Sequence, residues 1–181
     1  LDRGKIKEVS QKVLEAVERI RKIVNSLRLF ARPAHEETET ETDLNGIVRD
    51  VVLLSRTRLS NHEIELRFAL DESNPMALVR RGQVGQALIA ILNNAFEAVR
   101  PQQERWIEVL THATQESVQI RVTDSGPGLP KEIREHLFET FVAGQDPSKN
   151  SGVGLASARE MIQGSGGKIY LDTDSKNTRF I

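Results

Sequence analysis

The sequence predicts an α/β fold: a two-layer sandwich of a mixed, largely antiparallel sheet backed by helices, preceded by a long coiled-coil-type helix. Two periodicities predict it. Apolar residues recur at heptad spacing near the start of the chain, and several later segments alternate like strands between helical ones. The resulting order is helix, two strands, helix, two strands, helices and two strands, which is the order of a sheet with helices on one face. A chain of 181 residues suits one compact domain plus an appendage.

The first 32 residues carry an apolar seam held for more than three heptads. The seam residues are Ile6, Val9, Val13, Ala16, Ile20, Ile23, Leu27 and Phe30. Pro33 then ends the helix, because proline disfavours helix at the residue before it. One narrow apolar stripe with charged flanks needs other helices against it. We therefore expect a helical hairpin or a dimeric bundle, and the alternative is one helix packed on its own domain.

The segment "AHEETETET" is acidic and threonine-rich, and it predicts a linker over residues 34–42. Asp43 is a candidate N-cap for a helix through "LNGIVRDVVLLSRTRL". The strand candidates are "EIELRFAL", with Ile64, Leu66, Phe68 and Leu70 on one face, then "WIEVLTHA", "SVQIRVTD", "KIYLDT" after a glycine turn, and "NTRFI". The domain that contains them spans residues 43–181.

Composition excludes several classes of function. The formal net charge of −1 argues against a general nucleic-acid binder. The chain has no cysteine, which excludes disulfides, thiolate metal sites and cysteine nucleophiles. No apolar run reaches the roughly 18 residues of a membrane helix, and no signal peptide is visible. Because the chain does not begin with methionine, it could be a fragment of a protein whose membrane segment lies elsewhere.

Two asparagines interrupt the apolar segment "QALIAILNNAFEAV", residues 86–99. On a helix, Gln86, Ala90, Asn94 and Glu97 share one face, so a polar stripe runs along an element that is otherwise suited to burial. Burying an amide without a partner costs about 1–3 kcal/mol. We therefore expect something polar to lie over this stripe. The alternative is that the asparagines only hydrogen-bond to neighbouring loops.

Two further segments contain glycines where a ligand could approach the backbone. A strand runs directly into "DSGPGLP", and "GVGLASARE" opens a helix over residues 155–162. Each segment alone is also compatible with an ordinary turn or a glycine N-cap. Between them, "FETFVAGQDPSKNS" is polar and rich in turn residues, which is typical of a flap.

Taken in this order, the three segments resemble the ATP-binding domain of sensor histidine kinases. That domain belongs to a superfamily shared with gyrase, heat-shock chaperone ATPases and mismatch-repair ATPases. The resemblance covers residues 43–181, and "NAFEA" with a short flap is similar to the nitrogen-sensor-like subclass. It further implies that residues 1–33 are the second helix of a dimerisation and phosphoacceptor hairpin.

The resemblance implies specific roles. Asn94 would hold Mg²⁺ against the triphosphate, Asp124 would accept a hydrogen bond from the adenine N6, and Lys149 would approach the γ-phosphate. Phe138 and Phe141 would anchor the start of the flap. The nucleotide-binding residues implied are Asn94, Ala98, Asp124, Gly126, Gly128, Lys149, Gly152, Val153, Gly154, Leu155 and Thr178.

The chain also departs from that family. Ala90 stands where the kinases usually carry a second asparagine and the ATPases a catalytic glutamate, and Arg80 stands where an aspartate is common. An alanine can neither coordinate metal nor orient water. None of the four histidines (His35, His62, His112 and His136) has the setting of the phosphoacceptor.

The implied activity is phosphoryl transfer from ATP to a histidine outside this chain, with ATP and Mg²⁺ as cofactors. The implied partners are ATP or ADP, the protein's own phosphoacceptor helix in a homodimer, and a response regulator receiver domain. The implied location is the cytoplasm. Two alternatives remain: an ATPase or ATP-gated clamp of the same superfamily, and a nucleotide-binding scaffold impaired by Ala90.

Overall fold

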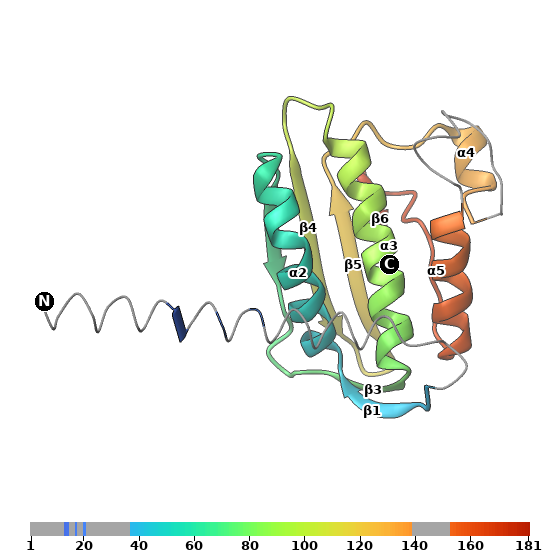
Figure 1. The fold of residues 1–181 in the computed structure, drawn as a ribbon. Helices are drawn as coiled ribbons and strands as arrows, with labels where there is room; N and C mark the ends of the chain where they lie inside the picture. Colours follow the sequence, from blue (N-terminus) through green and yellow to red (C-terminus); the bar gives the residue numbers. More distant parts are fainter. Residues whose placement is uncertain (1–12, 15–16, 18–19, 21–36, 139–152) are drawn as a thin grey trace, which may run out of the picture.

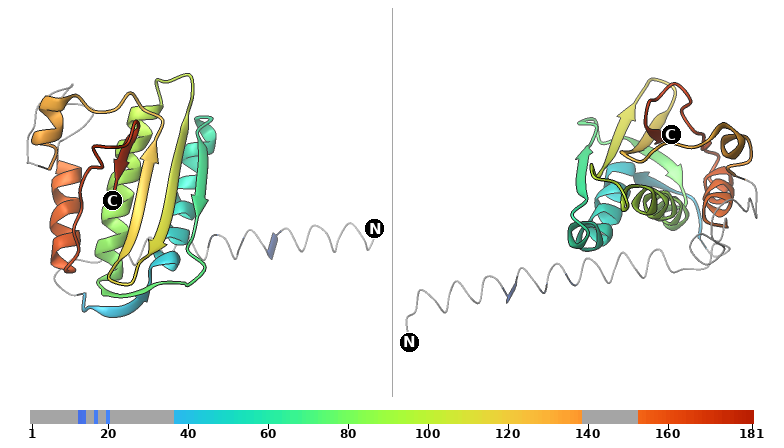
Figure 2. Two further views of the ribbon diagram at one scale, coloured as in Figure 1. Left: turned by 180° about the vertical axis from the view of Figure 1, so that it is seen from behind. Right: turned by 90° about the horizontal axis from the view of Figure 1, so that it is seen from above.

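The computed structural model describes residues 13–14, 17, 20, 37–138 and 153–181. Figures 1 and 2 show a sheet with helices on one of its faces, which confirms the expected α/β sandwich. In chain order the elements are β1 (Thr40–Asp43), α2 (Leu44–Asn61), β2 (Glu65–Ala69), β3 (Met76–Val79), α3 (Arg81–Val99), β4 (Trp106–Ala113), β5 (Val118–Asp124), α4 (Lys131–Glu135), α5 (Val153–Gly164) and β6 (Thr178–Phe180).

The main sheet has four strands in the order β2-β4-β5-β6. β2 pairs with β4 in parallel, whereas β4 with β5 and β5 with β6 are antiparallel, so the sheet is mixed and largely antiparallel as expected. A second, two-stranded sheet joins β1 to β3. β5 lies between β4 and β6, and this central place puts the residue at its end, Asp124, inside the domain.

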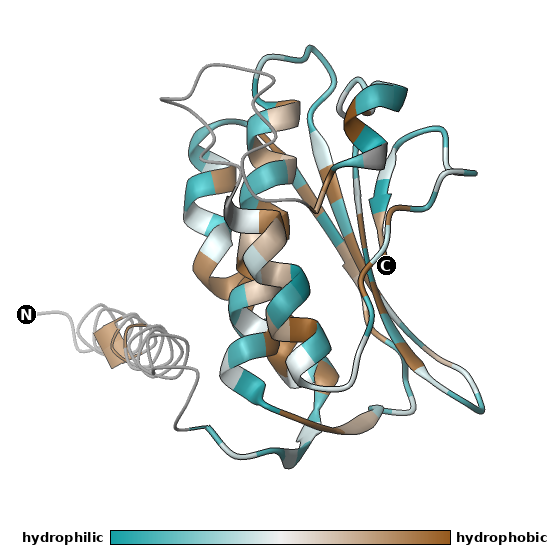
Figure 3. Cartoon of the chain, turned by 90° about the vertical axis from the view of Figure 1, so that its right-hand side faces the viewer, coloured by the Kyte–Doolittle hydropathy of each residue, from teal (hydrophilic) through white to brown (hydrophobic). Residues whose placement is uncertain are grey.

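The core lies between the sheet and helices α2, α3 and α5. Its fully buried side chains include Ile47, Val48, Val51, Val99, Ile107, Val109, Val122 and Phe180. Burying one such side chain stabilises the fold by about 1.5–3 kcal/mol. Figure 3 shows hydrophobic and hydrophilic residues interspersed along helices and strands, as expected for elements with one face in the core.

The predicted linker does not extend to residue 42. Residues 40–42 form most of β1, where Thr42 pairs with Ala77 of β3 and is 6% exposed. The segment has no apolar alternation, so the sequence contains no strand signal there, and backbone pairing with β3 decides its structure. Asp43 does precede α2 as predicted, but its side chain makes no cap and instead lies 3.3 Å from the Arg49 guanidinium.

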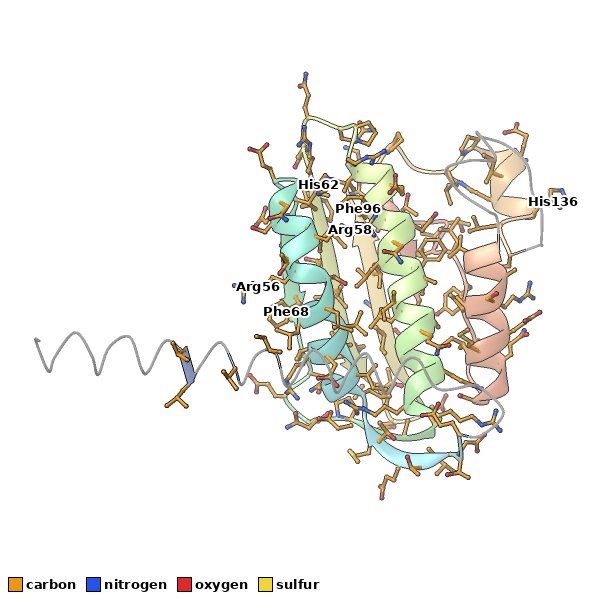
Figure 4. All side chains as sticks on the ribbon, in the orientation of Figure 1. Arg56, Arg58, His62, Phe68, Phe96 and His136 are labelled. Atoms are coloured by element: carbon orange, nitrogen blue, oxygen red, sulfur yellow. The ribbon has the colours of Figure 1, made fainter. Side chains whose placement is uncertain are left out.

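Two strand predictions need correction. Phe68 does not join the buried face with Ile64, because β2 is an edge strand of the sheet, and Phe68 is 52% exposed (Figure 4). The segment 168–173 makes only an isolated bridge between Leu171 and Phe180, although hydrogen bonds between Tyr170 and Ile181 continue the pairing with β6.

Most of the predicted heptad helix lies outside the described residues. Of its seam, Val13 and Ile20 are described; they are helical and more than half exposed. The prediction of a helical partner for this seam therefore stays a prediction. Among the described helices, none is both long enough and apolar enough to cross a membrane.

Candidate nucleotide-binding site

The end of strand β5 places a carboxylate inside the domain. Asp124 is 2% exposed, and its Oδ1 accepts one hydrogen bond, from the Gly126 N–H at 2.8 Å. Burial raises the pKa of Asp124 to about 6, and the Gly126 hydrogen bond offsets only part of that rise. A buried carboxylate with one donor retains acceptor capacity for a ligand.

Gly126 lies where no side chain fits. A Cβ at this position would come within 2.7 Å of Asp124 Oδ1 and 3.0 Å of the Ala98 Cβ. The turn after β5 therefore packs directly on α3, and Asp124, Gly126 and Ala98 form one corner. Gly128, two residues later, has a φ of 78°, a left-handed conformation that favours glycine.

Thr178 belongs to the same corner. It is the register partner of Asp124 in the ladder between β5 and β6, and it is 7% exposed. A pocket beside it is lined by Gly128, Leu129, Arg134, Leu171, Asp172, Ser175, Lys176, Asn177 and Thr178. Arg134 and Lys176 bring positive charge to this pocket. Neither residue is recognisable from the sequence, because a single basic residue in a short helix (Arg134) or in a loop (Lys176) forms no pattern.

The polar stripe of α3 is confirmed as its accessible side. Ala90, Asn94 and Glu97 are half-buried, whereas Leu92, Ala95 and Phe96 are buried on the other faces. The Asn94 amide has no hydrogen-bond partner among the described residues. Its oxygen is of the type that Mg²⁺ accepts as a ligand.

Asn93 is exposed beside the stripe, one turn before Glu97, and it is bonded to helix α2. The Asn93 oxygen accepts a hydrogen bond from Arg58 at 2.7 Å. The Arg58 guanidinium also lies 3.9 Å from the Phe96 ring centroid and 3.2 Å from a Glu97 carboxylate oxygen (Figure 4). The alternative of asparagines bonded only to loops is therefore wrong for Asn93, whose partner is on a helix.

The second glycine segment opens helix α5. This helix begins at Val153, and its first-turn N–H groups have no partner within the helix. A Cβ at Gly154 would meet no atom of the described residues within 4 Å. Leu155 is half-buried and packs against the core, which makes it a packing residue as well as a candidate contact.

Phe138, the first residue of the expected phenylalanine pair, packs against the core. Its ring meets Phe180 edge-on, with centroids 6.3 Å apart, and the Arg159 guanidinium lies 5.6 Å from its centroid. Phe141, Lys149 and Gly152 lie outside the described residues. Their expected roles stay predictions.

The described candidates come together at one end of the molecule. The end of β5, the C-terminal half of α3 with Asn94 and Ala98, and the start of α5 share this end, beside α4 (Figures 1 and 2). α3 and α5 pack side by side. The arrangement combines a buried acceptor, a close-packed glycine turn, the half-buried amide of Asn94 and the N-terminus of a helix, which suits a ligand with a hydrogen-bonding base and phosphates.

Comparison with known proteins agrees with this geometry. The family described as histidine kinase-, DNA gyrase B- and HSP90-like ATPase matches residues 80–181. The C4-dicarboxylate transport sensor protein DctB of Rhizobium meliloti is 30% identical over 173 residues, which cover 96% of this chain and 27% of DctB. The chain spans about a quarter to a half of the length of the curated relatives that it matches.

Two solved structures show the same fold. The catalytic domain of histidine kinase ThkA is 28% identical, covers 78% of this chain and 91% of its own, and superposes with a TM-score of 0.67. Full-length ShkA in complex with AMPPNP is 24% identical, with a TM-score of 0.68 over 96% of this chain and 37% of its own. Together with the family match over more than half of its residues, these results show that the chain belongs to the histidine kinase-, DNA gyrase B- and HSP90-like ATPase family.

Proposed function

We propose that this chain is the ATP-binding catalytic part of a sensor histidine kinase. The observation that carries the proposal is Asp124, a buried acceptor at the end of β5 that has one donor, the Gly126 N–H, among the residues that the structure describes. Adenine presents an amino group where guanine presents an oxygen, so a fixed acceptor selects adenine. Leaving such polar groups unpaired costs enough for roughly 10³-fold discrimination or more. The name of the family and the AMPPNP complex of ShkA support an adenine nucleotide.

Each described site residue then has a role. Asp124 and Thr178 hold the base, and Gly126 and Gly128 let the turn pass close to it. Asn94 approaches the phosphates from α3. The remaining implied contacts are Ala98, Val153, Gly154 and Leu155, with Lys149 and Gly152 from outside the described residues.

Among the described residues of the site, Asn94 alone is assigned as a protein ligand of Mg²⁺. Asn94 offers one half-buried amide oxygen, and the described residues contain no group of three acidic or histidine side chains that could hold a metal alone. Mg²⁺ in phosphate sites takes most of its ligands from phosphates and water, so one protein oxygen is compatible with it. Bound there, the ion would neutralise charge on the phosphates, while Asn94 keeps the nucleotide oriented.

The histidine that receives the phosphoryl group is, in this proposal, none of the four in the chain. The His62 ring packs edge-on against Phe96 at 4.9 Å, and its Nδ1 lies 2.9 Å from the Arg58 carbonyl oxygen (Figure 4). His112 is exposed on β4, 3.9 Å from Asp71. It pairs with Gln119, at the opposite end of the β4–β5 ladder from Asp124, which pairs with Ile107. We assign the acceptor to a hairpin helix that pairs with residues 1–33 in a cytoplasmic homodimer, and a response regulator would take the phosphoryl group from it.

Calorimetry with ADP and GDP tests the nucleotide assignment. We expect ADP binding that Asp124→Asn abolishes, and no GDP binding. Asp174→Asn is the matched control, because Asp174 is exposed. Equal affinity for ADP and GDP would reject the site as assigned.

Ala90 favours one competing function, a nucleotide-binding scaffold with weakened chemistry. Its methyl group lies half-buried on the α3 stripe, one turn before Asn94, where it offers no oxygen to a metal. Ala90→Asn separates the two functions. If the chain is a scaffold, the substitution should strengthen the Mg²⁺-dependent part of ATP binding and raise labelling of an added phosphoacceptor hairpin. If the chain is already an active kinase, labelling occurs without it.

A further inference from the structure

Helix α3 receives its N-terminal cap from a distant part of the chain. Arg80, at the N-cap position, makes no side-chain cap. Instead the carboxylate of Glu37 accepts hydrogen bonds from the N–H groups of Gly82 at 2.6 Å and Gln83 at 3.3 Å. These donors have no partner within a helix, and a negative charge there opposes the positive end of the helix dipole. Glu37 thus caps the N-terminus of α3 in place of a residue at the N-cap position.

Arg80 connects the same segment to helix α5. Its guanidinium lies 3.5 Å from the Glu39 carboxylate and donates to the Gly164 carbonyl oxygen at 3.0 Å. Gly164 is the last residue of α5, where carbonyl groups lack helical partners and favour a cation. The Arg80 N–H also points to the Ser165 hydroxyl at 3.5 Å.

We propose that Glu37 and Arg80 are positioning residues that clamp the segment 37–39 onto the two helices of the nucleotide site. The inference rests on the proposed function. α3 carries Asn94 and α5 begins at the glycine segment, and the clamp holds the opposite ends of both helices (Figure 1). Because the two helices pack side by side, fixing these ends fixes how their other ends face the nucleotide.

The clamp couples two equilibria: the docking of residues 37–39 on the helices and the binding of the nucleotide. A nucleotide that holds α3 and α5 in one arrangement favours the arrangement in which Glu37 and Arg80 are engaged. By linkage, an engaged clamp raises nucleotide affinity by the same factor. A displacement of the chain before residue 37 would then change the nucleotide site through residues 37–39.

Glu37 is the residue that decides the test. Its two hydrogen bonds are charge-assisted and cap a helix, whereas the pair between Arg80 and Glu39 is about one-third exposed on both sides and contributes little. Amide exchange at Gly82 and Gln83 measures the cap directly. We expect Glu37→Ala to accelerate it about fivefold to tenfold, and Glu37→Gln, which keeps an oxygen, to accelerate it less.

The matched control is Glu41→Ala. Glu41 is an exposed carboxylate on β1 of the same segment, and within the described structure it has no ion pair. It should leave exchange at both amides unchanged. If amide exchange at Gly82 and Gln83 is as slow in Glu37→Ala as in Glu41→Ala, the proposed clamp is wrong.

A rescue variant separates positioning from stability. Arg80→Ser places a local N-cap before α3, so Glu37→Ala with Arg80→Ser should recover the melting temperature and slow exchange at Gly82. ADP should slow exchange across residues 37–39 in the unmodified chain but not in this double variant, although both bind ADP. The coupling between the clamp and nucleotide binding is contradicted if ADP slows exchange across residues 37–39 equally in both proteins. It is also contradicted if ADP binds to the unmodified chain without slowing that exchange. If the unmodified chain does not bind ADP, the proposed function is wrong. The clamp is then still tested by amide exchange at Gly82 and Gln83, which needs no nucleotide.

Discussion

Asp124→Asn is expected to stabilise the nucleotide-free domain at neutral pH while abolishing ADP binding. Asp124 is 2% exposed, and burial raises its pKa to about 6. At pH 7 the domain therefore keeps a mostly ionised carboxylate in its interior with one hydrogen bond, from Gly126. An asparagine removes the charge and keeps an oxygen for that donor.

The size of the effect follows from the pKa. A rise from the model-peptide value of 3.8 to about 6 corresponds to about 3 kcal/mol at about 1.36 kcal/mol per unit. The folded state binds the proton of Asp124 more tightly than the unfolded state does. The stabilisation of the folded state by this proton is therefore complete below pH 3.8 and is lost as the pH rises to about 6. The new amide N–H groups need partners and offset about 1–2 kcal/mol. A net gain of about 1–2 kcal/mol at pH 7.5 remains.

Urea unfolding of both proteins at several pH values between about 4 and about 7.5 measures the difference. The stability of Asp124→Asn relative to the unmodified chain should rise across this range and level off above about pH 6. Asp174→Asn, an exposed control, should give a flat difference. A flat difference for Asp124→Asn, or a clear loss of stability at pH 7.5, would show that Asp124 is not a destabilising buried charge.

Two further substitutions test the fold, and a third tests the candidate site. Glu63→Gly should raise the free energy of unfolding by about 1 kcal/mol, because Glu63 has a φ of 56° after α2, and thermal unfolding measures it. Asn45→Ala should lower it by about 2–3 kcal/mol in urea unfolding without weakening ADP binding, since buried Asn45 accepts from Thr111 at 2.6 Å far from the candidate site. Gly126→Ala should weaken ADP binding at least tenfold by calorimetry, since its Cβ would push Asp124 or Ala98 aside.

The sequence predicted the elements whose periodicity is set by burial. β4 begins and ends where its alternation does, because Ile107 and Val109 face the core while their neighbours do not. α3 is longer than the predicted segment, since residues 81–85 are also helical and residues 82–85 are buried. In both cases one face of the element packs against the core, and this leaves a pattern in the sequence.

Contacts between distant segments left no such pattern. β1 has strand pairing without strand composition, and Glu37 caps a helix 45 residues away. Phe68 has the right alternation but belongs to an edge strand, a property of sheet order. The candidate site was predictable from its glycines, its asparagine and the aspartate at a strand end, whereas Arg134 and Lys176 are placed beside it only by the fold.

Two aspartates illustrate how the fold distinguishes structure from function. Asp71 accepts hydrogen bonds from the Ser73 hydroxyl, the Ala113 N–H and the Ser73 N–H, and these hold its pKa at about 2. Its hydrogen bonds connect the turn after β2 to the end of β4, so its carboxylate has a complete set of donors and needs no ligand. Asp124 is more deeply buried yet has one donor within the described part of the chain, and its pKa moves in the opposite direction. A carboxylate that the protein buries without satisfying costs stability, and a ligand that supplies the missing donor recovers part of it. That difference singles out the end of β5 as the place where a donor such as the adenine amino group would bind.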